Sequence, residues 1–145
     1  MASSDENVSV PLHAVIAGYG VPGRACGDWC AKQGMSVCIV ELNEKIVERV
    51  SAGGIEIILG SVSDESVLKS AGIERASIFA VTVPNDEAAL AATSIARRLN
   101  PSVRILTRCA FISRGMEAMK RGANHVVIAE QVVAEEFIKI LPASE

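Results

Sequence analysis

Six residues from Gly18 onward have the types and spacing of a phosphate-binding turn. They read Gly-Tyr-Gly-Val-Pro-Gly and lie between an apolar run, His13–Ala17, and a segment with helical periodicity. The first glycine permits a tight turn, the second lets a pyrophosphate approach the backbone, and the third allows close helix–strand packing. The free N–H groups of a helix N-terminus also favour an anion. We therefore predict that nucleotide phosphates bind beside Gly18, Tyr19, Gly20, Val21, Pro22 and Gly23.

Glu41 is the second feature that points to a nucleotide. It ends the next apolar run, 18 residues after Gly23, where a carboxylate can accept hydrogen bonds from two ribose hydroxyls. Its charge would repel a 2′-phosphate, so the pattern favours NAD or another adenosine ribose without that phosphate. Leu42 follows it and is expected to contact the same cofactor. Arg24 has two interpretations, a charge near the phosphates or a solvent-facing helix residue.

The turns after the third and fourth apolar runs are expected to border the same ligand. Ser61 and Val62 follow the third run, where a hydroxyl or a backbone N–H would contact the adenine. An ordinary strand-to-helix turn is the alternative. Val83 and Asn85 follow the fourth run and would cover the phosphates and ribose. Asn85 is also a good helix N-cap, and it can serve both purposes.

Two charged residues end the last two apolar runs. Arg108 follows the fifth run and could pair with phosphate, while Glu130 follows the sixth and could hold a cation or pair with Arg108. A local salt bridge of small energy is the alternative for both. His13 and His125 begin strands instead, so they are expected at the opposite edge of the sheet with structural roles.

The order of apolar and amphipathic segments predicts the scaffold. Alternating strands and helices indicate an α/β Rossmann fold, a doubly wound six-stranded parallel sheet of order 3-2-1-4-5-6. The ligand then binds where the strand order reverses. The predicted strands are His13–Ala17, Val37–Glu41, Ile55–Leu59, Ser77–Val83, Val103–Cys109 and His125–Ile128. The predicted helices span 21–33, 43–53, 64–71, 85–99, 111–121 and 131–141.

Composition narrows the classes of function. The chain has 145 residues, enough for one domain, which we expect over 12–141 after a polar, flexible leader at 1–11. Half of the residues are apolar but only 3% are aromatic, which suits a parallel sheet of Val, Ile, Leu and Ala. The net charge of −3 argues against a nucleic-acid partner. With no secretory signal and no apolar run of about 18 residues, we expect a cytoplasmic protein without direct membrane insertion.

The four cysteines have two interpretations. Cys26 and Cys30 are one helical turn apart, a spacing that a metal or a redox pair could use. No cluster of His and Cys with metal-site spacing accompanies them. We therefore favour small buried hydrophobic residues and predict no metal site.

In this order, the motifs resemble the N-terminal lobe of the RCK domain, also called the Trk-N or KTN domain. The glycine motif followed by Arg24, the acid Glu41 and the arginine Arg108 all have counterparts there. So do the segments A-G-I-E-R-A from Ala71 and G-A-N-H-V-V-I-A-E from Gly122. The resemblance covers about residues 13–141, nearly the whole predicted domain.

The resemblance implies a non-enzymatic regulatory domain. Such domains bind NAD(H), AMP, ADP or ATP and gate ion flow through a membrane potassium channel, transporter or antiporter. They form homodimers or larger rings, and they lie against the inner membrane through that partner or through a membrane segment that is missing here. The last two helices usually form the dimer. Here the apolar helices at 85–99 and 131–141 could do so, or could simply cover the sheet.

Three departures from the family pattern leave other functions open. Val21 stands where many members have Arg, which argues against strong triphosphate binding, and Ser61 replaces the usual Asp. The smaller C-terminal lobe of the family is expected to be absent. The alternatives are a fragment of an NAD-dependent oxidoreductase and an oligomerisation scaffold with a vestigial nucleotide site. A dehydrogenase would need a substrate domain and an acid or base near the nicotinamide.

Overall fold

The computed structural model describes residues 12–144, so the predicted leader at 1–11 lies outside the described residues. The strands are β1 (His13–Ala17), β2 (Ser36–Glu41), β3 (Ile57–Leu59), β4 (Ile78–Val81), β5 (Arg104–Cys109) and β6 (His125–Ile128). The helices are α1 (Val21–Lys32), α2 (Glu44–Ala52), α3 (Glu65–Ser70), α4 (Asp86–Leu99), α5 (Ile112–Lys120) and α6 (Ala129–Ile140). A short 3-10 helix, Ile73–Arg75, precedes β4.

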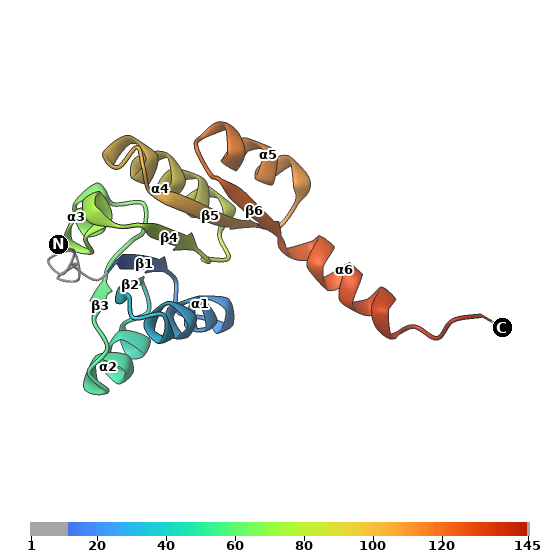
Figure 1. Cartoon of the computed structure of the whole chain (residues 1–145), viewed down its shortest axis with the longest axis horizontal. Helices are drawn as coiled ribbons and strands as arrows, with labels where there is room; N and C mark the ends of the chain where they lie inside the picture. Colours follow the sequence, from blue (N-terminus) through green and yellow to red (C-terminus); the bar gives the residue numbers. More distant parts are fainter. Residues whose placement is uncertain (1–11, 145) are drawn as a thin grey trace, which may run out of the picture.

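All six strands are parallel and form one sheet in the order β3-β2-β1-β4-β5-β6 (Figure 1). This confirms the predicted doubly wound Rossmann fold and its strand order. β1 pairs with β2 on one side and with β4 on the other. The chain therefore winds outward from β1 in both directions, and the loops after β1 and β4 separate at the reversal point.

Three strand starts, those of β2, β4 and β5, differ from the prediction by one residue, and two other strand boundaries differ by two residues for local reasons. β3 begins at Ile57 rather than Ile55, because Gly54 turns the chain with a φ of 86° just before it. β4 ends at Val81 rather than Val83. Thr82 still donates its N–H to Ala17 O (2.9 Å), but Pro84 has no N–H with which to continue the ladder.

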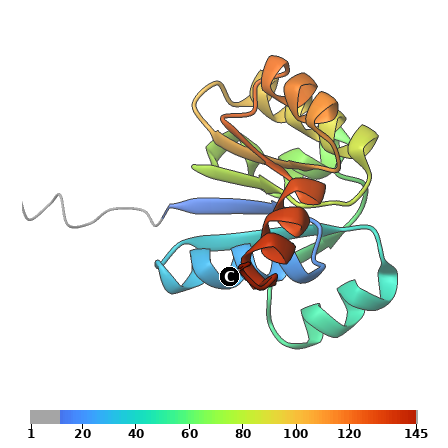
Figure 2. The same ribbon diagram turned by 90° about the vertical axis from the view of Figure 1, so that its right-hand side faces the viewer.

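The core lies on both faces of the sheet, as the alternation of side chains along β1 requires. Val15 and Ala17 join the larger apolar cluster, which α3, α4 and α5 cover. Ala14 and Ile16 join a smaller cluster that includes Cys30 of α1. Figure 2 shows α4 and α5 on one side of the sheet and α1 on the other. The buried residues are mostly Val, Ile, Leu and Ala, as predicted.

The two apolar helices singled out by the sequence have different environments. α4 packs on the sheet and buries five side chains: Ala89, Leu90, Ala92, Thr93 and Ala96. α6 begins at Ala129, directly after β6, and extends away from the sheet (Figure 1). Ala129 is half-buried and the other residues of α6 are exposed. Within residues 12–144, no helix has both the length and the apolar content of a membrane span.

Candidate functional site

A cavity of about 730 Å³ opens at the carboxyl edge of the sheet, at the point where the strand order reverses. The loops after β1, β2, β3 and β4 form its walls, together with the end of β5. Its volume is typical of sites for small molecules and cofactors. The predicted site residues that line it are Gly18, Tyr19, Gly20, Val21, Pro22, Glu41, Leu42, Ser61, Val62, Val83, Asn85 and Arg108.

The glycine loop has the geometry that its sequence predicts. Gly18 has a φ of 94°, in the left-handed region that favours glycine. Its carbonyl and that of Ala17 accept hydrogen bonds from the Thr82 hydroxyl, at 3.3 and 2.8 Å. A Cβ on Gly23 would overlap the Gly18 carbonyl oxygen, so helix and turn are in direct contact. By contrast, apart from its two chain neighbours, no heavy atom of residues 12–144 lies within 4 Å of a Cβ placed on Gly20, which leaves its backbone open to a ligand.

The N-terminus of α1 differs from those of α2, α3 and α4. The last three begin with a side chain that accepts backbone N–H bonds, from Asn43, Asp64 and Asn85 respectively. α1 begins after Gly20, with no side-chain cap and no acid in its first turn. The first turn of α1 lines the cavity and keeps its free N–H groups and its partial positive charge. This helix end is therefore suited to an anion that comes from outside the chain.

Glu41 holds two loops of the cavity together. Its Oε1 accepts the N–H of Tyr19 and its Oε2 accepts the N–H of Asn43, both at 2.8 Å. The sequence predicted a ribose-binding acid and did not predict this bracing role. Each carboxylate oxygen can accept more than one hydrogen bond, so the half-buried side chain retains capacity for ribose hydroxyls.

The wall next to Glu41 is apolar. Leu42 is 73% exposed and Val62 is buried, and both line the cavity. The Ser61 hydroxyl accepts the N–H of Ser63 at 3.1 Å and lies 2.7 Å from the Ser63 hydroxyl. Ser61 therefore stabilises its own turn, as one of its two interpretations predicted, and it also lines the cavity.

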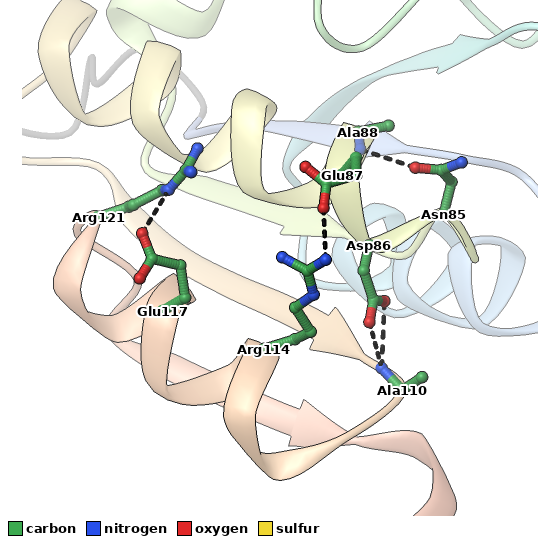
Figure 3. Close-up of polar contacts among 8 residues, drawn as sticks. All are labelled: Asn85, Asp86, Glu87, Ala88, Ala110, Arg114, Glu117 and Arg121. Atoms are coloured by element: carbon green, nitrogen blue, oxygen red, sulfur yellow. Dashed lines mark hydrogen bonds and ion pairs between the residues drawn. The ribbon is translucent and has the colours of Figure 1, made fainter.

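The wall beyond the reversal point is held by contacts at the start of α4 and between α4 and the end of β5 (Figure 3). The side-chain oxygen of Asn85 caps α4 by accepting the N–H of Ala88 at 2.9 Å. Its NH₂ group remains as a donor at the cavity wall. Asp86 accepts the N–H of Ala110 at 3.1 Å and so fixes the end of β5, which carries Arg108. Among residues 12–144, the Arg108 guanidinium makes one hydrogen bond, a long one of 3.5 Å to Thr82 O.

Three predicted site residues lie outside the cavity wall. Gly23 is buried behind the glycine loop, and Arg24 is exposed on α1. Glu130 lies in the first turn of α6, where its N–H donates to Ala110 O at 3.3 Å. Among the described residues Glu130 forms no ion pair with Arg108, one of the roles that the sequence left open for it, and it does not line the cavity. No group of three or more His, Cys, Asp or Glu side chains within 12–144 is placed to hold a metal.

Several residues of the cavity wall were not predicted from the sequence. Asn43, Val40 and Ala88 line it. Asn43 could have been predicted, because it closely follows Glu41 in the sequence.

Both histidines lie at the edge of the sheet that was predicted for them. His13 is buried at the opposite edge and is hydrogen-bonded to Ser36 Oγ and Ala71 O, while His125 lies 2.8 Å from an Arg104 nitrogen.

The cysteines behave as apolar residues. Cys30, Cys38 and Cys109 are buried and Cys26 is half-buried. Burial raises the pKa of the Cys38 thiol to about 12, with a further contribution from the Glu56 carboxylate. Burial also raises the pKa values of the other three thiols. This confirms the structural interpretation for the three buried residues.

We expect Cys38 of the native protein to resist thiol reagents at pH 8. A thiol with a pKa of about 12 carries roughly a thousandfold less thiolate at that pH than an ordinary cysteine, so Cys38 should not react until the protein unfolds. Mass spectrometry after a timed pulse of iodoacetamide measures this, with the urea-unfolded protein as control. Rapid modification of Cys38 in the folded protein would contradict the burial described here.

Comparisons of sequence identify relatives in potassium and proton transport. Residues 14–129 match the TrkA-N domain family. The chain is 27% identical, over 97% of its length and 26% of the relative, to the putative cation/proton antiporter YbaL of Escherichia coli. It is also 27% identical, over 90% of its length and 60% of the relative, to the Trk system potassium uptake protein TrkA homolog of Pyrococcus abyssi. The chain thus spans about a quarter of the first relative and three fifths of the second.

Solved structures show the same fold. The TrkA-N domain of the inner membrane protein ybaL from Escherichia coli has a TM-score of 0.84 at 27% identity, covering 93% of this chain and all of that one. The GsuK channel bound to NAD has a TM-score of 0.76 at 18% identity, over 89% of this chain and 23% of that one. The AMP-bound Kef CTD of Shewanella denitrificans has a TM-score of 0.73 at 18% identity, over 91% and 83%. Because the family match covers most of the chain, including every residue of the cavity wall, the chain belongs to the TrkA-N domain family.

Proposed function

We propose that the chain binds an adenine nucleotide in this cavity, with NAD(H) the first candidate, and that the bound nucleotide gates ion flow through a potassium transport protein. The observation that carries the proposal is the uncapped N-terminus of α1 between Glu41 and Arg108. An anion site with a ribose acceptor on one side and a cation on the other matches the charge pattern of a nucleotide.

Each part of the nucleotide has a matching wall. The adenine would lie against Leu42 and Val62, with the adjoining ribose hydroxyls on Glu41. The phosphates would lie on the first turn of α1. The second ribose and the nicotinamide of NAD would extend past the reversal point, toward Asn85 and Arg108. AMP and ADP would use the first part of the same path.

The charge of the cavity wall favours ADP or NAD, which carry two phosphates, over ATP, which carries three. Arg108 is the one Lys or Arg side chain in the cavity wall within residues 12–144. Val21, at the start of α1, supplies no charge. A triphosphate would bring two more negative charges than AMP to a wall with a single cation, so ATP should bind more weakly unless a cation accompanies it.

Relatives support the regulatory part of the proposal. Their names place them in Trk uptake, Kef efflux and potassium channel systems, and the chain covers only part of each. Neighbouring structures are named as bound to NAD, ADP and AMP. We accordingly propose a sensor rather than an enzyme, cytoplasmic and attached to the inner membrane through its transport partner, with a homodimer as its working form.

Isothermal titration of the purified chain tests the proposal. NAD⁺, NADH, AMP, ADP and ATP are each titrated with and without Mg²⁺. We expect micromolar dissociation constants for NAD(H) or AMP and weaker binding of Mg²⁺-free ATP. A folded protein that releases no heat with any of the five would refute nucleotide sensing and favour a scaffold role.

Arg108→Gln should weaken nucleotide binding by about 10- to 100-fold, because a charge-assisted bond to phosphate is lost. The same titration measures it. Arg104→Gln is the matched control, since Arg104 lies on the same strand but at its opposite end, beside His125. Equal effects of the two variants would mean that Arg108 acts only through general charge.

A further inference from the structure

Two of the four cysteines lie together on α1, outside the wall of the nucleotide cavity. Cys26 and Cys30 are one helical turn apart; Cys30 belongs to the smaller apolar cluster and Cys26 packs against it. Cys38 and Cys109 belong to the larger cluster, on the opposite face of the sheet. Cys26 and Cys30 are therefore a pair of thiols that the proposed function does not use.

Both thiols of this pair line a second groove, about 800 Å³ in volume, which lies between α1 and strands β4, β5 and β6. Cys30 is buried and Cys26 is half-buried. Trp29 lies next to Cys30 in the sequence, lines the same groove and is 56% exposed. An ion can thus reach Cys26 from water, while Cys30 is shielded from it.

The spacing of the two thiols suits a bridging ion better than a disulfide. Burial raises the pKa of the Cys30 thiol and the charge of Cys26 raises it further, so the two sulfurs interact. Cβ atoms one helical turn apart are separated by about 5–6 Å, whereas those of a disulfide are about 3.5–4.5 Å apart. Two metal–thiolate bonds of about 2.3 Å each span roughly 4.6 Å between sulfurs, which the two side chains can provide without unwinding the helix.

The composition of the groove wall selects the kind of ion. Within residues 12–144, the wall contains no His, Asp, Glu or Met side chain, and apart from Thr82, Thr107 and Arg108 its other members are apolar. A structural Zn²⁺ takes four ligands, and an iron–sulfur cluster takes four cysteines. Cu(I) is a soft ion that prefers thiolates, and two of them in a line satisfy it.

We propose that Cys26 and Cys30 form a two-coordinate binding site for Cu(I). Each thiol releases one proton to solvent and forms one S–Cu bond, and the copper stays in the +1 state, so the complex carries one negative charge. The two polarisable sulfurs spread that charge, and the half-buried Cys26 leaves one side of the complex next to water. The site requires no nucleotide and does not depend on the proposed function.

Competition for Cu(I) with the coloured chelator bicinchoninate tests the site, in the presence of ascorbate and without oxygen. We expect the purified chain to withdraw one Cu(I) from the chelator and to keep it against an equal concentration of Zn²⁺. Trp29 is the sole tryptophan and lies in the same wall, so its fluorescence should fall as the ion binds. A folded chain that withdraws no copper, copper that Zn²⁺ displaces, or copper uptake that leaves the Trp29 emission unchanged would overturn the proposal.

Cys26→Ala should weaken Cu(I) binding by at least about 100-fold, because one of two ligands is lost and changes to outer-shell partners alone cost about 10- to 100-fold. Alanine is the best helix former, so circular dichroism should show an unchanged fold. Cys109→Ala is the matched control, since it removes a buried thiol from the other face of the sheet and should bind Cu(I) as the wild type does. Copper held at full affinity by Cys26→Ala, or weakened equally in both variants, would overturn the assignment.

Discussion

Gly23→Ala is expected to lower the free energy of unfolding by about 3 kcal/mol or more and to abolish nucleotide binding. The new Cβ would overlap the carbonyl oxygen of Gly18 and lie 2.8 Å from Thr82 Oγ1. Neither neighbour can move freely, since the Gly18 N–H is bonded to Val40 O and the Thr82 hydroxyl is bonded to Ala17 O. α1 would have to move away from the turn, and its N-terminus would leave the cavity. Urea unfolding and isothermal titration measure the two effects.

Gly27→Ala is the control for that substitution. Gly27 is buried on the same helix, but a Cβ there would meet its nearest neighbours at 3.9 Å, an ordinary contact. The variant should keep its nucleotide affinity and be at least as stable as the wild type, because alanine favours a helix more than glycine does. Equal stability of Gly23→Ala and Gly27→Ala would contradict the close contact between Gly23 and Gly18.

Glu41→Ala is expected to weaken nucleotide binding by more than 100-fold. The substitution removes the proposed ribose acceptor and also releases the N–H groups of Tyr19 and Asn43, so both flanking loops lose their fixed position. The cost in stability should be smaller, about 1–3 kcal/mol, because the freed N–H groups can bond to water at this edge of the sheet. Isothermal titration and urea unfolding again separate the two effects.

Two variants sharpen the test of Glu41. Glu41→Gln keeps the shape but places an NH₂ group against one of the two backbone donors, so it should also bind poorly. Glu48→Ala removes an exposed acid of α2 and should change nothing. Full affinity in Glu41→Gln would mean that the negative charge has no part in recognition.

The sequence was sufficient to predict the features that depend only on residues close together in the chain. Gly18 must adopt a positive φ, and Gly23 must allow a close contact between helix and turn. Both requirements can be predicted from the place of these glycines between a strand and a helix. The caps Asn43 and Asn85 are equally local, because their side chains bond within the next turn. Alternation of strands and helices then determined the order of the sheet.

Long-range placement was the part that sequence alone could not supply. The apolar periodicity of α6 is the same whether the helix covers its own sheet or a partner, so Phe137 and Ile138 gave no sign that the helix leaves the domain. Likewise, the Glu41 carboxylate accepts two backbone N–H groups, and the hydroxyl of Thr82, from the second half of the fold, donates to the carbonyl before the glycine turn. Such contacts depend on the packing of loops that lie far apart in the sequence.

The most direct test of nucleotide binding in this cavity is an NMR titration of the ¹⁵N-labelled chain with NAD⁺. Bound nucleotide should shift the amide signals of four loops together, at residues 18–21, 41–43 and 60–62 and at Val83 and Asn85. The amides of His13, Ser36 and His125, at the other edge of the sheet, should not move. Shifts gathered at that opposite edge, or an unchanged spectrum at millimolar NAD⁺, would contradict the account.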